Sequence, residues 1–451
     1  MITSQRFAGQ RFAVLGLARS GLASVESLLA GGADVTVWDN REEARAALAD
    51  RTTVADPLTF DLAGFAGVVV SPGVPLNRHP IATHAAACDV PVIGDIELFA
   101  AIRADLPPHR VVGITGTNGK STTTALIHHL CLAAGIPARL GGNIGLPVLG
   151  EAALPAGGVY VLELSSYQID LTHSLDCDVA VLINLSPDHL DRYDGFAGYA
   201  AAKARLFAMQ RDDRHAVFGR GDADTLAIAQ RVAAARAPGL VQTPDPAALT
   251  GQADWPSLQG PHNLQNAAVA IAVAQALGIA EAVWRPALAS FVGLAHRMER
   301  VAEADGVLFV NDSKATNAAS TAPALAAYPR IHWICGGLPK SDNLDECAPA
   351  FGHVVAAYVI GEAGPLFAEI LRPHMPVTRS EMLCDAVRQA MAAAQPGDVI
   401  MLSPACASFD QFRDFEARGE AFREIVTTLI ADRDTPCSAI PGLDDLNRGN
   451  D

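Results

Sequence analysis

The chain has 451 residues, half of them apolar, and a formal net charge of −16. This length is sufficient for about three domains, each with its own hydrophobic core. The acidic balance argues against nucleic acid as the main partner, because a phosphate backbone is bound through basic surface.

The sequence carries no signal for a membrane or for secretion. No uninterrupted apolar run is long enough to cross a bilayer, and Met1 to Gln10 lacks the layout of a signal peptide. The eight cysteines are scattered, without Cys-x-x-Cys or His-Cys spacing, so we expect neither structural zinc nor a disulfide framework. We expect a cytoplasmic protein that is a monomer and has no nucleic-acid or membrane partner.

Strand-like and helix-like runs alternate from end to end, which is typical of parallel α/β domains. We predict three: a Rossmann-like N-terminal domain over residues 1–98, a central P-loop ATPase-like parallel sheet domain over 99–297, and a Rossmann-like C-terminal domain over 298–434. Residues 435–451 are polar and contain proline, and we predict a mobile tail there.

The first predicted βα unit joins a strand over 11–15 to a helix that ends near Ala30. Its turn reads Gly16-Leu17-Ala18-Arg19-Ser20-Gly21. The turn approximates the Gly-x-Gly-x-x-Gly fingerprint, but the methyl group of Ala18 would crowd a pyrophosphate, which disfavours an NAD-dependent dehydrogenase. From this motif alone, a purely structural turn and a nucleotide site are equally compatible.

An apolar strand over 111–115 leads into the run Gly116-Thr117-Asn118-Gly119-Lys120-Ser121-Thr122, which opens a helix. Glycines let backbone N–H groups face an anion, Lys120 can reach terminal phosphates, and Ser121 can ligand Mg²⁺. The strict Walker spacing is not met, because Ile114 stands where that pattern requires glycine. A glycine-rich turn without function is the alternative, but the order of strand, loop and helix favours ATP binding.

Polar residues follow apolar strands at several further positions, and ligands of open parallel sheets gather at that edge. These residues are Glu163, Asn184, Asn311, Asp312 and Ser403. Because they recur in two domains, we expect a site between domains. A carboxylate such as Glu163 suits Mg²⁺, although a solvated strand end explains Glu163 alone almost as well.

Lys203 stands in an unusual pattern. If residues 196–207 are helical, this lysine shares one face with four large side chains, those of Phe196, Tyr199, Leu206 and Phe207. Burial would lower its pKa, and the neutral amine could react with CO₂ to give a carbamate able to ligand metal. The alternative, which these residues by themselves favour, is a snorkelling lysine with its ammonium in water.

Two lysine-bearing segments stand at strand ends of the third domain. The run from Asn311 to Asn317 contains Lys314 and suits an anionic substrate, although its polar residues are also common helix caps. The turn Gly336-Gly337-Leu338-Pro339-Lys340-Ser341 supplies a second lysine. Together Lys314 and Lys340 could hold a dicarboxylate.

Taken in order, these motifs resemble those of the bacterial Mur ligase family along nearly the whole chain. The resemblance rests on Gly116 to Thr122, Gly141-Gly142-Asn143-Ile144-Gly145, Glu163 to Gln168, Asp188 to Tyr193, Ala202-Lys203, His262-Asn263 with Asn266, His296-Arg297, Asn311 to Asn317, and Ser403 to Ser408. The short phosphate loop marks the wider family. The segments Asp312 to Asn317 and Ser403 to Ser408 are similar to those of the members that add D-glutamate.

The resemblance implies an ATP-dependent ligase that adds D-glutamate to UDP-N-acetylmuramoyl-L-alanine through an acyl phosphate, in peptidoglycan precursor synthesis, with ATP and Mg²⁺. The implied catalytic residues are Lys120, Glu163, His189 and Lys203. The implied metal ligands are Ser121, Glu163, His189 and Lys203, the last as a carbamate. The implied ATP-binding residues are Gly116, Thr117, Asn118, Gly119, Lys120, Ser121, Thr122, Asn263, Asn266, Arg297 and Asp312.

The remaining implied residues bind the two other substrates. Those for the UDP-sugar are Arg19, Ser20, Asp39, Asn40, Arg41, Ser71, Gly73, Asn143, Ser165 and His189. Those for D-glutamate are Lys314, Thr316, Lys340, Ser408 and Phe415. The alternatives are a folylpolyglutamate synthase-like or another Mur-type amide ligase, and a nucleotide-binding regulator that ligates nothing. D- and L-glutamate are not distinguished at this level.

Overall fold

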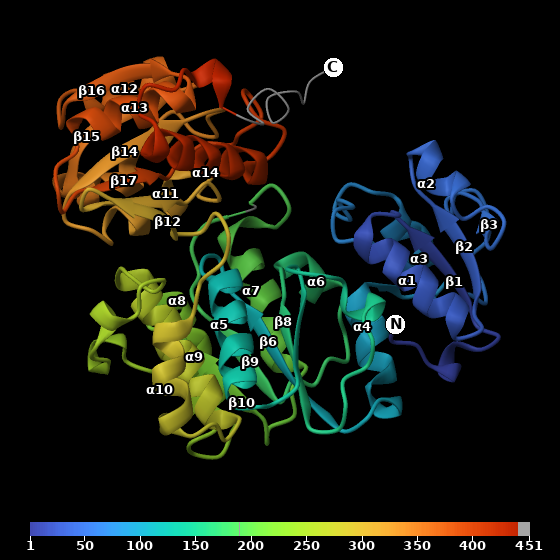
Figure 1. Ribbon diagram of the computed structural model, residues 1–451. Helices are drawn as coiled ribbons and strands as arrows, with labels where there is room; N and C mark the ends of the chain where they lie inside the picture. Colours follow the sequence, from blue (N-terminus) through green and yellow to red (C-terminus); the bar gives the residue numbers. More distant parts are fainter. Residues whose placement is uncertain (189, 441–451) are drawn as a thin grey trace. The chain divides into compact units, whose positions relative to one another are not determined.

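The computed structural model describes residues 1–188 and 190–440 (Figure 1). They form two compact units, Met1–Pro246 with Gln265–Ala287, and Ala247–Leu264 with the chain from Leu288 onward. The first unit contains two sheets and the second contains one. Within the described ranges, every helix is too short or too polar to cross a membrane.

The N-terminal sheet has five parallel strands in the order β3-β2-β1-β4-β5, which is the Rossmann order. Its elements are β1 (Arg11–Leu15), α1 (Arg19–Ala30), β2 (Asp34–Trp38), α2 (Glu42–Ala46), β3 (Thr53–Val54), β4 (Gly67–Val70), α3 (Ile81–Ala87), β5 (Val92–Ile93) and α4 (Asp95–Ile102). In the first turn Gly16 has φ +89°, and a Cβ at Gly21 would stand 1.9 Å from the Gly16 carbonyl oxygen. Both glycines are therefore required for the close approach of α1 to β1.

The central sheet has six parallel strands in the order β11-β10-β9-β6-β8-β7. Its strands are β6 (His109–Thr115), β7 (Ala138–Gly142), β8 (Gly158–Glu163), β9 (Val179–Leu182), β10 (His215–Phe218) and β11 (Val241–Gln242). The helices of this part of the chain are α5 (Lys120–Ala133), α6 (Ser166–Asp170), α7 (Gly195–Ala208), α8 (Ala223–Ala234), α9 (Pro261–Ala276) and α10 (Glu281–Ser290). Because β6 lies between β8 and β9, the loop after β6 is flanked by the ends of both neighbours.

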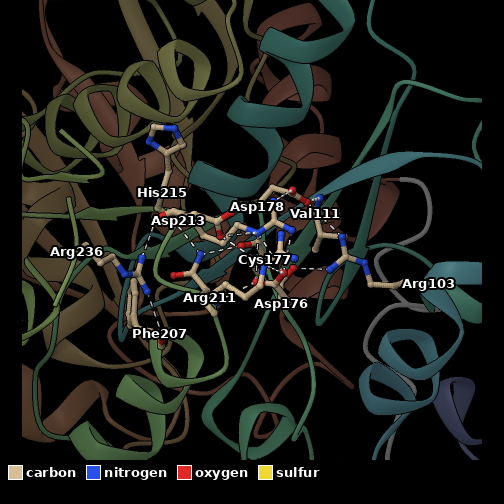
Figure 2. A network of polar contacts seen from close by, with 12 residues as sticks. Arg103, Val111, Asp176, Cys177, Asp178, Phe207, Arg211, Asp213, His215 and Arg236 are labelled. Atoms are coloured by element: carbon tan, nitrogen blue, oxygen red, sulfur yellow. Dashed lines mark hydrogen bonds and ion pairs between the residues drawn. The ribbon is translucent and has the colours of Figure 1, made fainter. Parts of the chain in front are cut away.

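A network of ion pairs fastens the opposite ends of these central strands (Figure 2). Asp178 accepts hydrogen bonds from Arg214 at 2.7 Å, from Arg103 at 3.2 Å and from the Val111 N–H at 2.8 Å. Asp176 pairs with Arg214 at 2.8 Å. Each carboxylate thus has a cationic partner, and Asp178 ties the start of β6 to the chain before β9. We interpret this network as structural.

The sheet of the second unit has the order β12-β13-β17-β14-β15-β16 and is parallel except at one edge. Its elements are β12 (Glu299–Ala304), β13 (Val307–Asn311), α11 (Ala318–Leu325), β14 (Ile331–Gly336), β15 (Val354–Ile360), α12 (Gly364–Leu371), β16 (Val377–Glu381), α13 (Leu383–Ala393), β17 (Val399–Leu402) and α14 (Phe415–Ala431). Strand β12 is antiparallel to β13. Their connection, Asp305-Gly306, has positive φ at both residues, as a tight hairpin turn requires.

A disulfide joins Cys384 of α13 to Cys437. The scattered spacing of the cysteines did not predict this bond, because the partners are 53 residues apart and meet only in the folded domain. Arg388 of α13 also donates to the carbonyl of Thr435 at 2.5 Å, and Ile440 is buried. Residues 435–440 of the predicted tail are therefore fastened to the domain, and 441–451 lie outside the described residues.

We expect the Cys437→Ser variant to unfold at a lower temperature than the unsubstituted protein when no reductant is present. The bond closes a long loop in the unfolded chain, which in the chain-entropy model is worth up to about 4 kcal/mol. Calorimetry with and without a thiol reductant measures this, and the difference should vanish in reductant. Cys88→Ser, which changes a free thiol, is the matched control. Equal melting temperatures of Cys437→Ser and the unsubstituted protein in buffer without reductant would contradict the bond.

Candidate active site

The phosphate loop lies between the end of β6 and the start of α5, as the sequence predicts. Gly116 and Gly119 have φ of +152° and +83°. A Cβ at Gly119 would stand 2.5 Å from Oδ1 of Asn266, and one at Gly116 would stand 3.2 Å from Cβ of Ile183. The loop is therefore packed so closely against α9 and the end of β9 that both positions require glycine.

The first residues of α5 supply a cation and hydroxyl groups to this loop. Nζ of Lys120 donates to the carbonyl of Gly116 at 3.0 Å and to that of Thr117 at 2.8 Å, so the ammonium lies over the loop. Ser121 is buried and Thr122 half-buried in the first helical turn. A helix N-terminus with a cation held at this distance suits a bound polyphosphate.

Glu163 ends β8, and Asn143 lies beside it. The backbone N–H of Asn143 donates to the Glu163 carbonyl at 2.8 Å, and its Nδ2 donates to Oε1 at 3.1 Å. Glu163 is 2 % exposed, and its Oε2 has no hydrogen-bond partner among the described residues. A buried carboxylate oxygen without a donor fits a hard cation such as Mg²⁺.

Ser165 lies two residues beyond Glu163 and is engaged by α6. Its side chain accepts from the N–H of Gln168 at 3.2 Å, and its own backbone N–H donates to Oε1 of Gln168 at 3.1 Å, forming a capping box. The cap fixes the direction in which the chain leaves the end of β8.

Lys203 is buried in α7, on the predicted face with Tyr199, Leu206 and Phe207. It is 1 % exposed, and Nζ donates to Oγ1 of Thr115 at 3.3 Å and lies 4.7 Å from the centre of the Tyr199 ring. Burial, reinforced by the charge of Lys120, holds the pKa of Lys203 well below its usual range. The snorkelling alternative is therefore wrong, and burial favours the neutral form of the amine.

Of the predicted metal ligands, the structure describes Ser121, Glu163 and Lys203, whereas His189 lies outside the described residues. Within residues 1–188 and 190–440, no group of three or more His, Cys, Asp and Glu side chains is arranged to hold a metal ion.

The predicted UDP residues of the N-terminal sheet gather around its first turn, whereas Asn143 and Ser165 lie beyond the ends of central strands β7 and β8. Oδ2 of Asp39 accepts from the N–H of Leu17 at 2.6 Å, and Oδ1 accepts from the N–H of Arg41 at 2.9 Å. Burial by itself would raise the pKa of Asp39, but the hydrogen bonds from Arg41 and Leu17 outweigh burial and lower it to about 2. Ser71 donates to the Gly16 carbonyl at 2.8 Å and so joins the two strand ends.

The other predicted UDP residues are more open to solvent. Arg19, Asn40 and Arg41 are exposed, and Ser20 is half-buried. A side chain that the sequence did not assign, that of Arg192, holds the loop around Gly73: it donates to the Val74 carbonyl at 3.1 Å and stacks 4.3 Å from the centre of the Tyr167 ring.

In the second unit, Asp312 lies beyond β13 against the end of β17. Its Oδ1 accepts from the N–H of Met298 at 3.1 Å, and its Oδ2 accepts from the hydroxyl of Ser403 at 2.8 Å. Burial raises the pKa of Asp312 to about 7, because these two hydrogen bonds and the charge of Arg297 only partly offset it. The predicted strand-end residues Asp312 and Ser403 are therefore in direct contact.

The raised pKa of Asp312 predicts a pH-dependent stability of this unit. An aspartate carboxyl in an unfolded chain has a pKa of about 3.9. The contribution of Asp312 to the free energy of unfolding is therefore fully present below about pH 4 and is lost as pH rises through about 7. We expect Asp312→Asn to remove that loss. The melting temperature of the variant minus that of the original should be more positive at pH 8 than at pH 5. A difference that does not change with pH would contradict the assignment.

The predicted D-glutamate residues occupy neighbouring loops of the second unit. Nζ of Lys314 lies 4.0 Å from the centre of the Phe415 ring, and Nζ of Lys340 donates to Oγ1 of Thr316 at 3.4 Å. Ser408 is buried, and its carbonyl accepts from two N–H groups of the following turn. The helix start predicted after Lys314 is also found, since Asn317 caps α11.

Arg418, which the sequence did not mark, fastens two of these loops to α14. It is 1 % exposed and donates to the hydroxyl and carbonyl of Ser313 at 3.0 and 2.9 Å, to the carbonyl of Cys406 at 3.0 Å and to that of Ala407 at 3.2 Å. All four acceptors are uncharged, so a positive charge remains buried beneath the loops of Lys314 and Ser408. Its partners lie up to 105 residues away in the sequence, and no local pattern reveals them.

Two further predicted ATP residues, Asn263 and Arg297, belong to this unit. Asn263 is buried on α9 and donates to the carbonyl of Gln259 at 3.1 Å. Arg297 lies between His296 and Met298, which have φ of +60° and +48°. The backbone therefore takes the left-handed conformation once before and once after Arg297, at a conformational cost.

One compositional signal for the site is the use of lysine. The chain contains four lysines, at positions 120, 203, 314 and 340, and every other fixed cationic side chain is an arginine. All four lie in the loops and helix described above. Arginine forms the ion-pair network of Figure 2, whereas lysine occurs only at these four positions.

Models of three protein domains match the chain. These are the Mur ligase MurD-like N-terminal domain over residues 10–94, the Mur ligase middle domain over 114–243, and the Mur ligase glutamate ligase domain over 296–406. A UDP-N-acetylmuramoylalanine–D-glutamate ligase from Novosphingobium aromaticivorans is 80 % identical, covering 97 % of this chain and 99 % of its own. One of the same name from Zymomonas mobilis is 54 % identical, covering 95 % of this chain and 100 % of its own.

Solved structures share the fold. A MurF ligase from Thermotoga maritima in complex with ADP has a TM-score of 0.59 at 16 % identity and covers 96 % of this chain and 98 % of its own. The FolC protein of E. coli in complex with ADP has a TM-score of 0.52 at 19 % identity and covers 79 % of this chain and 99 % of its own. From the domain matches and the identity to its relatives, the chain belongs to the Mur ligase family.

Proposed function

We propose that this protein is an ATP-dependent amide ligase that joins D-glutamate to UDP-N-acetylmuramoyl-L-alanine, with release of ADP and phosphate. The observation that carries the proposal is the 80 % identity, over 97 % of the chain, to a ligase of that name. The phosphate loop of the first unit and the lysine-bearing loops of the second supply groups suited to ATP and to a dicarboxylate.

The chemistry follows from the poor reactivity of a carboxylate. In the proposed reaction, a carboxylate oxygen of the L-alanine moiety attacks the γ-phosphorus of ATP, and the bond to the β,γ-bridging oxygen breaks to release ADP. The neutral amine of D-glutamate then attacks the acyl carbon, the C–O bond to phosphate breaks, and the amine loses a proton. Lys120 would offset the charge of the transferred phosphoryl group.

Mg²⁺ would be held by the hydroxyl of Ser121, by Oε2 of Glu163, by His189 and by Lys203 as a carbamate. When bound, it would neutralise charge on the phosphate oxygens. The fit rests on the buried Oε2, which lacks a donor among the described residues, and on the depressed pKa of Lys203, since carbamate formation requires a neutral amine. Asn143 holds Glu163 in place through its other carboxylate oxygen.

The remaining substrates are assigned to the other two proposed domains. The loops around Asp39, Ser71 and Gly73, within the proposed domain 1–98, would bind the UDP moiety, and Asn143 and Ser165 of domain 99–297 would face the muramoyl part. Lys314, Lys340 and the loop of Ser408, within domain 298–434, would bind the carboxylates of D-glutamate. Orienting two reactants in this way can lower a barrier by about 7–11 kcal/mol in the best intramolecular cases.

A substrate-omission assay of ADP release tests the proposal. Release should require both UDP-N-acetylmuramoyl-L-alanine and D-glutamate, and L-glutamate should not replace the D-enantiomer. Release supported by L-lysine or diaminopimelate would identify a different member of the family. Release that requires a folate and L-glutamate would identify a folylpolyglutamate synthase-like enzyme, and absence of ADP release with every amino acid would identify a non-ligating nucleotide binder.

A further inference from the structure

Asn184 stands at the end of β9 and makes several contacts with the phosphate loop. Its side-chain Oδ1 accepts from the N–H of Asn118 at 2.9 Å and from the N–H of Thr117 at 3.1 Å, and its Nδ2 donates to the Asn118 carbonyl at 3.1 Å. Its backbone carbonyl also accepts from the N–H of Thr117 at 3.0 Å. The carboxamide therefore accepts from both Thr117 and Asn118 and donates to Asn118.

The segment after Asn184 supports the loop from a second direction. Oγ1 of Thr117 accepts from the N–H of Ser186 at 3.0 Å and donates to the Ser186 carbonyl at 3.2 Å, and it lies 3.2 Å from the hydroxyl of Tyr199. Gly116 packs against Ile183. The backbone of Thr117 and Asn118 and the hydroxyl of Thr117 are thus held by the chain that follows β9.

We propose that Asn184 is a positioning residue for ATP, which preorganises the phosphate loop by holding the backbone of Thr117 and Asn118. This inference rests on the proposed binding of ATP phosphates to that loop. Asn184 acts through the loop. Its carboxamide holds the backbone of Thr117 and Asn118, so the N–H groups at the start of α5 would face the anion at a smaller cost of ordering.

The side chain has to be a carboxamide for this role. Alanine would leave the loop peptides without their side-chain partners. Aspartate would keep both acceptor contacts, but it would place an anion against the Asn118 carbonyl and near the phosphates, with no donor. A protonated aspartate restores the donor, so it mimics the carboxamide.

The test compares ADP affinity, measured by isothermal titration calorimetry, for the full-length protein and three variants. We expect Asn184→Ala to bind ADP about 10- to 100-fold more weakly and Asn184→Asp more weakly still at pH 8. The affinity of Asn184→Asp relative to the unsubstituted protein should recover as pH is lowered toward 5, and that of Asn184→Ala should not. Affinity for UDP-N-acetylmuramoyl-L-alanine, measured in parallel, reports whether each variant is folded.

Asp222→Ala is the matched control, because Asp222 accepts from the N–H of Leu185, the residue next to Asn184, and does not bond the phosphate loop. We expect this variant to keep its ADP affinity. Unchanged ADP affinity in Asn184→Ala, an equal loss in Asp222→Ala, or a pH response shared by the alanine variant would overturn the proposal. Failure of the unsubstituted protein to bind ADP would instead overturn the proposed function.

Discussion

Replacing Lys203 with alanine should lower the rate of ligation by more than about 100-fold. Removing a residue that only orients a metal ligand costs up to about 100-fold, and we propose that Lys203 is itself a ligand. The amine of Lys203 is buried beside Thr115 and Tyr199, and burial depresses its pKa. In the proposed site the neutral amine reacts with CO₂, and the resulting carbamate would supply a carboxylate where the side chain itself could not. The alanine variant lacks that group. Measurement of kcat for ADP release gives the loss.

Short carboxylic acids should partly restore the activity of Lys203→Ala, because acetate or formate can occupy the space of the missing carbamate. A second readout is independent of activity: ¹³C-labelled CO₂ should give one carbamate signal that disappears in Lys203→Ala, and only four lysines can contribute to it. Arg205→Ala, an exposed cation of the same helix, is the control. No rescue and no labelled signal would contradict the carbamate.

Replacing Lys314 with alanine should lower kcat/KM for D-glutamate by about 100-fold, the equivalent of one charge-assisted hydrogen bond in a site partly shielded from water. The ammonium lies 4.0 Å from the centre of the Phe415 ring, which restricts its position. Its charge adds to that of Lys340 and of the buried Arg418, so the loops favour an anionic ligand. Initial rates at varied D-glutamate, with the other substrates saturating, give the ratio.

The effect of Lys314→Ala should be confined to D-glutamate, with KM for ATP and for the UDP substrate changed less than about threefold. Arg413→Ala removes one exposed positive charge two residues before Phe415 and controls for a general electrostatic effect. A similar loss in Arg413→Ala, or a loss spread equally over all three substrates, would show that Lys314 does not contact the amino acid.

Local sequence patterns were sufficient for the elements that carry most of the site. The strand, glycine loop and helix around Lys120, the apolar face of α7 around Lys203, and the capped helix start after Lys314 all depend on residues within a few turns of each other. Glycine conformations, helical periodicity and capping act over that range, so a sequence read along its length contains them.

Other features could not be predicted from neighbours in the chain. The partners of Asn184 lie 66 and 67 residues away, those of Arg418 up to 105, and Cys384 and Cys437 are separated by 53. For Lys203, the local pattern by itself favoured an ammonium in water. Only the packing of α7 against the end of β6 shows that the amine is buried and hydrogen-bonded to Thr115.

The sequence therefore determined which groups are available: four lysines, a glycine loop, and strand-end carboxylates and amides placed at intervals along an acidic chain. Their protonation and their contacts were decided by the tertiary structure, because desolvation and hydrogen bonding depend on which distant segments cover a side chain. Glu163 illustrates this division. Its position at a strand end is evident from the sequence, but folding buries it, gives one carboxylate oxygen to Asn143 and leaves the other suited to a cation.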